Sequence, residues 1–249
     1  MLDREFGNPK ENEEQAIDPL AGGIYQQGYQ CGMLWGASMA VGAESFRRCE
    51  DQGEAISTAI IATKHMTESF LSSAKSIDCG DITETDFGNK WSFAKYMFTG
   101  KFYGCFKLAE KWAPEAIKSA HEGLSLEKPE LKQQPISCAS EVIKLMGGSD
   151  EYVVMVAGFA GGLGFSGSGC GALGAAIWKI TLELVKQDDW KYTLSNPVIE
   201  KIMNKFYEAS DYKMECKEIC GRRFKTIDEH SEYIKTGGCS KILTALAQS

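Results

Sequence analysis

The stretch "AGFAGGLGFSGSGCGALGAAIW", residues Ala157 to Trp178, is a glycine run that ends at a single cysteine, Cys170. It contains a GxGxxG pattern from Gly162 to Gly167, preceded by the apolar run "YVVMV" and followed by a helix-like segment. That outline is typical of a turn that holds a phosphate at the start of a helix. The stretch therefore indicates one of two structures, a phosphate loop or a turn that presents a thiol.

An internal repeat favours the thiol. "AGGIYQQGYQCGMLWGASMAVG", residues Ala21 to Gly42, aligns without a gap with "AGGLGFSGSGCGALGAAIWKIT", residues Ala160 to Thr181, and pairs Cys31 with Cys170. Both copies have glycines before a Cys-Gly pair, but the first copy lacks the GxGxxG pattern. A lone GxGxxG outside a series of alternating strands and helices is weak evidence. No dinucleotide is therefore expected as a cofactor.

Two further cysteine-centred blocks recur in the same order. "CGDITETDF", which begins at Cys79, resembles "CKEICGRRF", which begins at Cys216, and "YGCFKLAEKWA" around Cys105 resembles "GGCSKILTALA" around Cys239. Three blocks in register predict a tandem duplication. The predicted parts are a polar N-terminal segment at 1–20, a first, partial repeat at 21–120, a linker at 121–135, and a second, complete repeat at 136–249.

The spacing of apolar residues predicts an all-α fold with two similar helical subdomains. Residues 55–74 place apolar side chains along one helical face, and residues 171–187 read as a buried helix. Asn196 followed by Pro197 is a favoured helix start. The segment "GSDEYVVMVAGFAGG" fits a helix capped by Ser149 or Asp150 better than an isolated strand.

Composition narrows the class of protein. The 249-residue chain has a net charge of −7, which argues against nucleic acid as the main partner. No apolar run reaches the length of a membrane span, and the polar start carries no secretory signal, so the cytoplasm is the expected location. Nine cysteines are not expected to form a disulfide framework in that reducing compartment. Because no CxxCH motif is present, no covalent haem is expected.

Several cysteines stand where a helix is predicted to begin. They are Cys105, Cys138, Cys170 and Cys239. Free amides and the partial positive charge of a helix N-terminus stabilise a thiolate, so we expect lowered pKa values there. A single cysteine is commonly a small buried hydrophobe. Taken together, however, Cys138, Cys170, Cys216 and Cys239 are predicted to share one functional site.

Other residues near these cysteines are predicted to have smaller roles in the site or none. Gly169 and Gly171 flank the cysteine of the glycine run and let the backbone approach whatever its sulfur holds. Cys220 is interpreted as accessory because the first copy has Thr83 in its place. His230 is predicted to be an exposed polar residue within "IDEHSEYIK".

The segment from Ser137 to Trp178, followed by "CKEICGRRF" and "GGCSKILTALA", resembles the C-GCAxxG-C-C family of redox-active proteins, which are small helical proteins with four spaced cysteines. One departure is Ala175, which stands where the family motif closes with glycine. Split-Soret cytochromes are similar in their two-part build, but they bear haem. The resemblance implies a first, partial cysteine set and a second, complete set, at Cys31, Cys79 and Cys105 and at Cys138, Cys170, Cys216 and Cys239.

Three functions remain open at this point. Four thiolates from separate helices would ligate an iron–sulfur cluster for electron transfer or sensing. The alternative is a metal-free thiol–disulfide oxidoreductase in which Cys170 attacks and another cysteine resolves the mixed disulfide. A structural zinc site with four cysteine ligands is a further alternative. The implied partner is an unidentified redox protein, and the helix from Cys170 could pack on its counterpart from Cys31 within one chain or across a homodimer.

Overall fold

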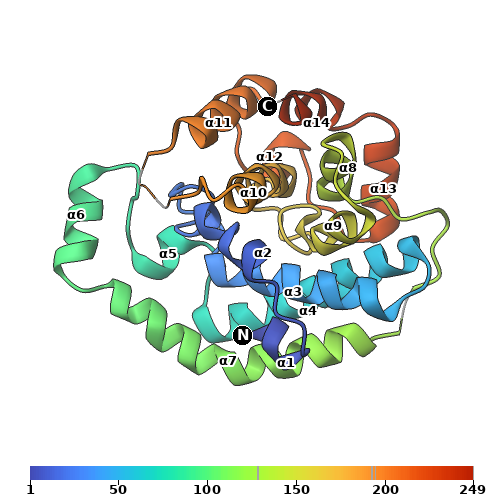
Figure 1. Ribbon diagram of the computed structural model, residues 1–249, viewed down its shortest axis with the longest axis horizontal. Helices are drawn as coiled ribbons and strands as arrows, with labels where there is room; N and C mark the ends of the chain where they lie inside the picture. Colours follow the sequence, from blue (N-terminus) through green and yellow to red (C-terminus); the bar gives the residue numbers. More distant parts are fainter. Residues whose placement is uncertain (128, 192, 194, 249) are drawn as a thin grey trace.

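The structure is a computed structural model that describes residues 1–127, 129–191, 193 and 195–248. Within these residues the secondary structure is helical, and β-structure is limited to two isolated bridges. The predicted all-α class is therefore confirmed. Figure 1 shows the first half of the chain around the lower and left parts of the molecule and the second half above it.

The two halves contain similar series of helices. Those of the first half are α1 (Leu2–Glu5), α2 (Glu11–Gln15), the 3-10 helix η1 (Asp18–Leu20), α3 (Gly32–Arg48), α4 (Gln52–Ala74), α5 (Cys79–Thr83), α6 (Lys90–Phe98) and α7 (Phe102–Ser125). Those of the second half are α8 (Cys138–Leu145), α9 (Asp150–Met155), the 3-10 helix η2 (Ala157–Phe159), α10 (Gly171–Lys186), α11 (Pro197–Ala209), α12 (Cys216–Ile219), α13 (Ile227–Lys235) and α14 (Ser240–Ala247).

The helices correspond pairwise in their spacing from the cysteines. Helices α2 and η1 begin as far before Cys31 as α9 and η2 begin before Cys170. Helix α6 follows Cys79 at the same spacing, and with the same length, as α13 follows Cys216. The helical repeat therefore extends upstream of Ala21, into the segment that the sequence marks only as polar.

Each repeat ties two of its cysteines together with one antiparallel bridge. The N–H of Cys31 donates to the carbonyl of Ile77 at 2.8 Å, and the bridge pairs the residues that precede Cys31 and Cys79. In the second repeat the N–H of Cys170 donates to Met214 at 3.0 Å, within the equivalent bridge. Backbone hydrogen bonds therefore hold the start of α3 beside that of α5, and the start of α10 beside that of α12.

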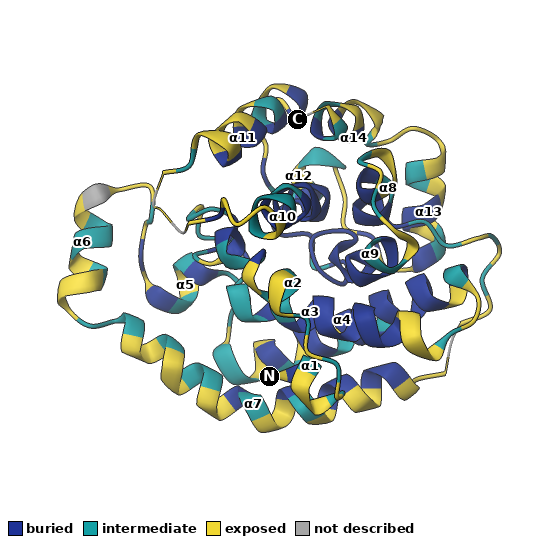
Figure 2. Cartoon of the chain, in the orientation of Figure 1, coloured by how far each residue is buried: buried dark blue, intermediate teal, exposed yellow. Residues whose placement is uncertain are grey.

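The two subdomains share one hydrophobic core. Helix α4 packs on α3 and α7 in the first repeat, while α9 and η2 of the second repeat pack on α3 and α4. The ring of Trp35 lies edge-on to that of Phe159, with centroids 4.6 Å apart. The same Trp35 ring closely approaches Gly174 of α10. Helix α10, which follows Cys170, thus meets its counterpart α3 within one chain, through the ring of Trp35. Figure 2 shows that α4 and α10 are largely buried.

Local capping signals act as expected. The side chain of Asn196 accepts from the N–H of Val198 at 3.0 Å, with Pro197 at the first helical position. Ser149, rather than Asp150, caps α9 by accepting from the N–H of Tyr152. One predicted helix start is wrong. Cys105 lies inside α7, because that helix begins at Phe102. The same helix continues to Ser125, into the segment interpreted as a linker.

Candidate functional site

The glycine run of the opening stretch forms a left-handed turn. Residues 161–165 all have positive φ, including the buried Leu163 at 67° and Phe165 at 65°. A non-glycine residue in this conformation costs about 1–2 kcal/mol. Residues 22–26 of the first repeat adopt the same conformation. Strain that is kept in both repeats points to a local function.

The turn acts on sulfur atoms. It ends at Cys170, and the N–H of Gly161 within it donates to the sulfur of Cys138. The carbonyl of Gly162 is already occupied, since it accepts from the side chain of Gln30 at 2.8 Å. The stretch therefore builds a support for two thiols.

Five cysteines of the second repeat line one small cavity. It measures about 10 Å³, close to the space of a single water. Helix starts supply most of the thiols, because α8 and α12 begin with a cysteine and α10 and α14 directly follow one. The side chains of Phe224, Ile234 and Ile242 close it. The cysteines are Cys138, Cys170, Cys216, Cys220 and Cys239.

Cys220 lies at the centre of a shared set of hydrogen bonds. Its sulfur is 3.9 Å from that of Cys216, one helical turn away. Hydrogen bonds from the thiols of Cys216 and Cys239, and from the hydroxyl of Tyr233, lower the pKa of Cys220 well below its ordinary value. The same bonds raise the pKa values of Cys216 and Cys239. The hydrogen bonds thus favour the charged form of Cys220, the cysteine that the sequence marks as accessory.

The predicted lowering of pKa at helix starts is wrong for Cys138, Cys170 and Cys239. Burial raises the pKa of Cys138 to about 12 and that of Cys170 to about 11. Backbone N–H groups of Leu173 and Ala172 donate to the Cys170 sulfur and oppose this effect. Loss of solvation therefore outweighs the helix N-terminus in a dry site. These thiols are protonated at neutral pH unless a cation replaces the proton.

His230 is buried rather than exposed, which corrects the sequence prediction. Its side chain is 1% exposed and lines the cysteine cavity. Nδ1 lies 3.0 Å from the carbonyl oxygen of Ile136, so Nδ1 carries the hydrogen and donates. Burial lowers the pKa of His230 to about 4, which leaves the imidazole neutral at neutral pH. The rings of Phe224 and Phe165 cover it, with centroids 5.0 and 5.3 Å away.

The two glycines that flank Cys170 have different surroundings. Gly171 lines the cavity, and a Cβ atom there would lie 1.8 Å from the carbonyl oxygen of Phe159. Gly169 instead faces the first repeat, where its carbonyl accepts from the side chain of Gln30 at 3.0 Å. A Cβ on Gly169 would meet Ile24 at 2.6 Å.

The first repeat also gathers its three cysteines. Cys31, Cys79 and Cys105 interact electrostatically, and the Cys105 sulfur lies 3.6 Å from the hydroxyl of Tyr96. Burial raises the pKa of Cys31 to about 11 and that of Cys79 to about 12. The N–H of Met33 donates to the Cys31 sulfur. The predicted second set of thiols is thus brought together, with a phenol beside it.

Both repeats have a tyrosine beside their cysteines, which the alignment of the cysteine blocks did not include. Tyr96 follows Cys79 at the same spacing as Tyr233 follows Cys216. In the first repeat the ring of Phe87 lies 5.5 Å from that of Tyr96, and in the second the ring of Phe224 lies 5.2 Å from that of Tyr233. Extending the alignment beyond the cysteine blocks would have revealed this tyrosine.

The repeats differ at two positions of the cluster. Where the second has Cys220, the first has Thr83, whose hydroxyl donates to the carbonyl of Cys79 at 2.7 Å. Where the second has His230, the first has Phe93. The first repeat therefore lacks both the thiolate and the imidazole of the second.

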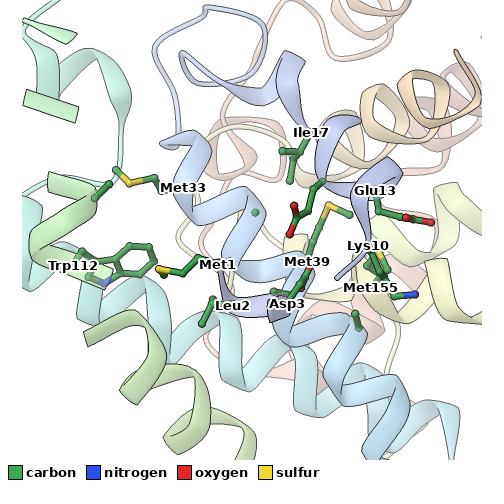
Figure 3. Close-up of a pocket in the computed structure, with 16 residues that line it drawn as sticks. Met1, Leu2, Asp3, Lys10, Glu13, Ile17, Met33, Met39, Trp112 and Met155 are labelled. Atoms are coloured by element: carbon green, nitrogen blue, oxygen red, sulfur yellow. The ribbon is translucent and has the colours of Figure 1, made fainter. Parts of the chain in front are cut away.

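A larger cavity of about 290 Å³ lies in the first repeat (Figure 3). Parts of α1, α2, α3 and α7 line it, with Met155 of α9, and Figure 3 shows the side chains of Met33, Met39 and Trp112 around it. The equivalent helices of the second repeat, α9, α10 and α14, pack around α8. The cavity thus occupies the position in the first repeat that α8 occupies in the second. The four-residue α1 fills only part of this position.

The described residues contain neither a ready-made metal site nor a membrane-spanning helix. Among them, no group of three or more histidine, cysteine, aspartate or glutamate side chains is arranged to hold one metal ion. In the same part of the chain no helix combines the length and the apolar character needed to cross a membrane.

Comparisons with known proteins agree with the two-part build. A family model described as "Putative redox-active protein (C_GCAxxG_C_C)" matches residues 1–117 and 136–249. Neither the curated proteins nor the solved structures provide a match. The family match covers both helical repeats, including the upstream helices and all the cysteines described above. The chain belongs to the C-GCAxxG-C-C family of redox-active proteins.

Proposed function

We propose that Cys138, Cys170, Cys216 and Cys239 ligate an iron–sulfur cluster and that the protein serves in electron transfer or redox sensing. The observation that carries this proposal is the position of the thiols. Four cysteines from four separate helix starts line one enclosed cavity. A dithiol centre needs only two cysteines, whereas four thiolates are the usual ligand set of a cluster.

The donor set fits a cluster better than a single zinc ion. Zinc needs all four sulfurs about 2.3 Å from one point, and no three ligand side chains among the described residues have such an arrangement. A cluster distributes its thiolates over several irons and does not require that convergence. The cavity of about 10 Å³ must nevertheless widen, so we expect loading to change the conformation around the thiols.

Protein groups around the cavity would tune the bound cluster. When present, the cluster supplies one-electron chemistry. The N–H groups of Gly161 and Leu173 donate to the sulfurs of Cys138 and Cys170 and stabilise their negative charge. Phe224 and Ile242 exclude water. Because burial raises the pKa of Cys138 to about 12, loading must release protons and becomes stronger as pH rises.

Metal analysis of the anaerobically purified and reconstituted protein tests the proposal. We expect visible absorption together with stoichiometric iron and acid-labile sulfide. The single changes Cys138→Ser, Cys170→Ser, Cys216→Ser and Cys239→Ser should each remove most of the iron. Cys49→Ser is the matched control, since Cys49 lies outside the cavity, and it should retain the iron. Protein that stays colourless and iron-free after reconstitution would exclude the cluster.

A second candidate function rests on Cys216 and Cys220. Their sulfurs are 3.9 Å apart, and the two residues span one helical turn, within the Cα separation of about 4.4–6.8 Å that a disulfide bridges. The Cys220 thiolate would attack a partner disulfide, forming a mixed disulfide and releasing one partner sulfur as thiolate. Cys216 would then lose its proton and attack Cys220, so that the second partner sulfur leaves as a thiol. Cys220 replaces Cys170 as the attacking group because burial keeps Cys170 protonated.

Alkylation separates these two candidates. Because hydrogen bonds lower the pKa of Cys220, iodoacetamide at pH 6 should label Cys220 at least tenfold faster than Cys170 in metal-free protein. Peptide mass spectrometry after timed quenching measures both rates. Equal labelling of the two cysteines would remove the basis of the dithiol candidate. Cys220→Ser should leave cluster loading intact, because Cys220 is outside the proposed ligand set.

A further inference from the structure

The helical hairpin of α6 and the start of α7 exposes an unusual set of large apolar side chains. We call this set the α6–α7 surface, formed by Trp91, Met97, Phe98, Tyr103 and Phe106. Trp91 is 86% exposed and Phe98 is 90% exposed. Large exposed patches of this kind mark interaction sites in soluble proteins. Figure 2 shows α6 standing apart from the body of the molecule, with exposed and half-buried residues along it.

The equivalent helix of the second repeat behaves in the opposite way. Helix α13 has the same length and spacing as α6, but it buries Ile227, His230 and Ser231. Its residues His230 and Ile234 line the cysteine cavity. None of the described side chains of α6 is buried. Packing within the chain therefore covers the apolar residues of α13, and in α6 it engages Phe93 and Tyr96 but leaves Trp91, Met97 and Phe98 exposed.

The α6–α7 surface is also positively charged. No aspartate or glutamate stands between Phe87 and Ala109, and that segment contains four of the chain's lysines. Lys95 and Lys107 are exposed among the apolar side chains. The whole chain has a net charge of −7, so this hairpin contrasts with the rest of the molecule.

The surface adjoins the first set of thiols. Helix α6 carries Tyr96 and α7 carries Cys105, whose hydroxyl and sulfur are 3.6 Å apart. Lys101, between the two helices, donates from Nζ to the carbonyl of Thr83 at 2.9 Å and joins the hairpin to α5. A protein bound to the α6–α7 surface would therefore lie beside Cys105 and its neighbours Cys31 and Cys79.

We propose that the α6–α7 surface docks an acidic electron-carrier protein. Charge complementarity selects the partner, because a surface with exposed lysines among apolar side chains attracts an acidic protein. A symmetric dimer through this surface would bring the same lysines against each other. The redox character of the partner rests on the proposed function, whereas its acidity rests on the lysines alone.

Titration calorimetry with a purified acidic [4Fe–4S] ferredoxin tests the proposal. We expect binding at low ionic strength that weakens at least tenfold between 20 and 200 mM salt. Lys95→Glu combined with Lys107→Glu should weaken binding at least tenfold, and Trp91→Ser combined with Phe98→Ser should weaken it similarly. Lys201→Glu combined with Lys225→Glu is the charge-matched control, because both lysines are exposed elsewhere. That control should bind like the unchanged protein.

Each alternative result overturns the proposal. No binding of the ferredoxin, or equal weakening by the control pair, would refute an acidic partner on this surface. Self-association in sedimentation that Trp91→Ser and Phe98→Ser abolish would assign the surface to a second copy. Binding to vesicles with one-fifth anionic lipid, lost in the Lys95→Glu and Lys107→Glu protein, would assign it to a membrane. The same titration with Cys138→Ser protein measures docking without the second-repeat cluster. Docking that survives this change would stand even if the cluster proposal failed.

Discussion

The two repeats support their cysteines with the same backbone and cover them differently. In each, a left-handed turn and one antiparallel bridge hold two helix starts together, those of α3 and α5 in the first repeat and those of α10 and α12 in the second. In the second repeat, α8 and α13 then enclose the thiols. In the first, a 290 Å³ cavity lies in the place of α8, and α6 stands away from the body. The comparison separates what positions the cysteines, which is common to both repeats, from what packs around them, which differs.

This difference supports the proposal that the cluster is bound in the second repeat. Its cavity contains a fifth cysteine and a histidine, whereas the first repeat has Thr83 and Phe93 at those positions. Tyrosine and phenylalanine beside the thiols are common to both. The shared aromatic residues pack beside the thiols in both repeats, whereas Cys220 and His230 add titratable groups only in the second.

The largest expected effect is on the turn that carries Cys170. Gly171→Ala should lower the free energy of unfolding by about 3–5 kcal/mol, because its Cβ would lie 1.8 Å from the carbonyl oxygen of Phe159. Gly32→Ala at the equivalent position should cost only about 1 kcal/mol, since its nearest atom is the Cα of Ala21 at 3.2 Å. Urea unfolding of both variants measures the difference. Equal losses would mean that the two turns are equally tight.

Much of the fold could be predicted from the sequence because its determinants are local. The apolar spacing of α4 and the caps of α9 and α11 lie within a few residues of the helices they define. The cysteines could be grouped because the repeat aligns them in register. The predicted helix start at Cys105 is wrong because the preceding Gly104 is typical of a helix boundary, whereas α7 starts at Phe102.

The protonation states of the site could not be predicted in the same way. Burial of Cys138 and Cys170 depends on helices far apart in the chain, and that burial raises their pKa values to about 12 and 11. His230 lies among charged residues in the sequence, which favoured an exposed position. Its helical spacing with the apolar Ile227 and Ile234 was the available signal: Ile227 is buried, and His230 and Ile234 line the cavity.

His230 should make the free energy of unfolding depend on pH, with a change of about 3 kcal/mol. Burial lowers its pKa from 6.5 to about 4, so between these values the unfolded chain binds a proton that the folded protein does not. Stability is therefore fully present above pH 6.5 and falls by about 3 kcal/mol as pH drops toward 4. His230→Phe, which copies Phe93 of the first repeat, should lose this part of the pH dependence.

Urea unfolding at pH 7 and pH 4.5 measures the effect of His230. Other groups titrate in both proteins, so the difference between the original protein and His230→Phe reports the histidine alone. His65→Gln is the control for removal of one histidine, because His65 pairs with Glu122 at the surface. If His230→Phe and the original protein lost the same stability between the two pH values, the buried neutral imidazole would be contradicted.

The smallest expected effects have opposite signs in the two repeats. Gly174→Ala in α10 should lower the free energy of unfolding by about 1–2 kcal/mol, because its Cβ would lie 2.6 Å from the Trp35 ring. Gly36→Ala in α3 should raise it by about 0.5–1 kcal/mol, since alanine favours a helix and no atom lies within 4 Å of the added Cβ. Gly36 lines the 290 Å³ cavity, so the added methyl group enters open space. Thermal unfolding of both variants measures the two shifts. A destabilising Gly36→Ala would mean that the cavity is filled in solution, and the contrast between an open first repeat and a closed second would not hold.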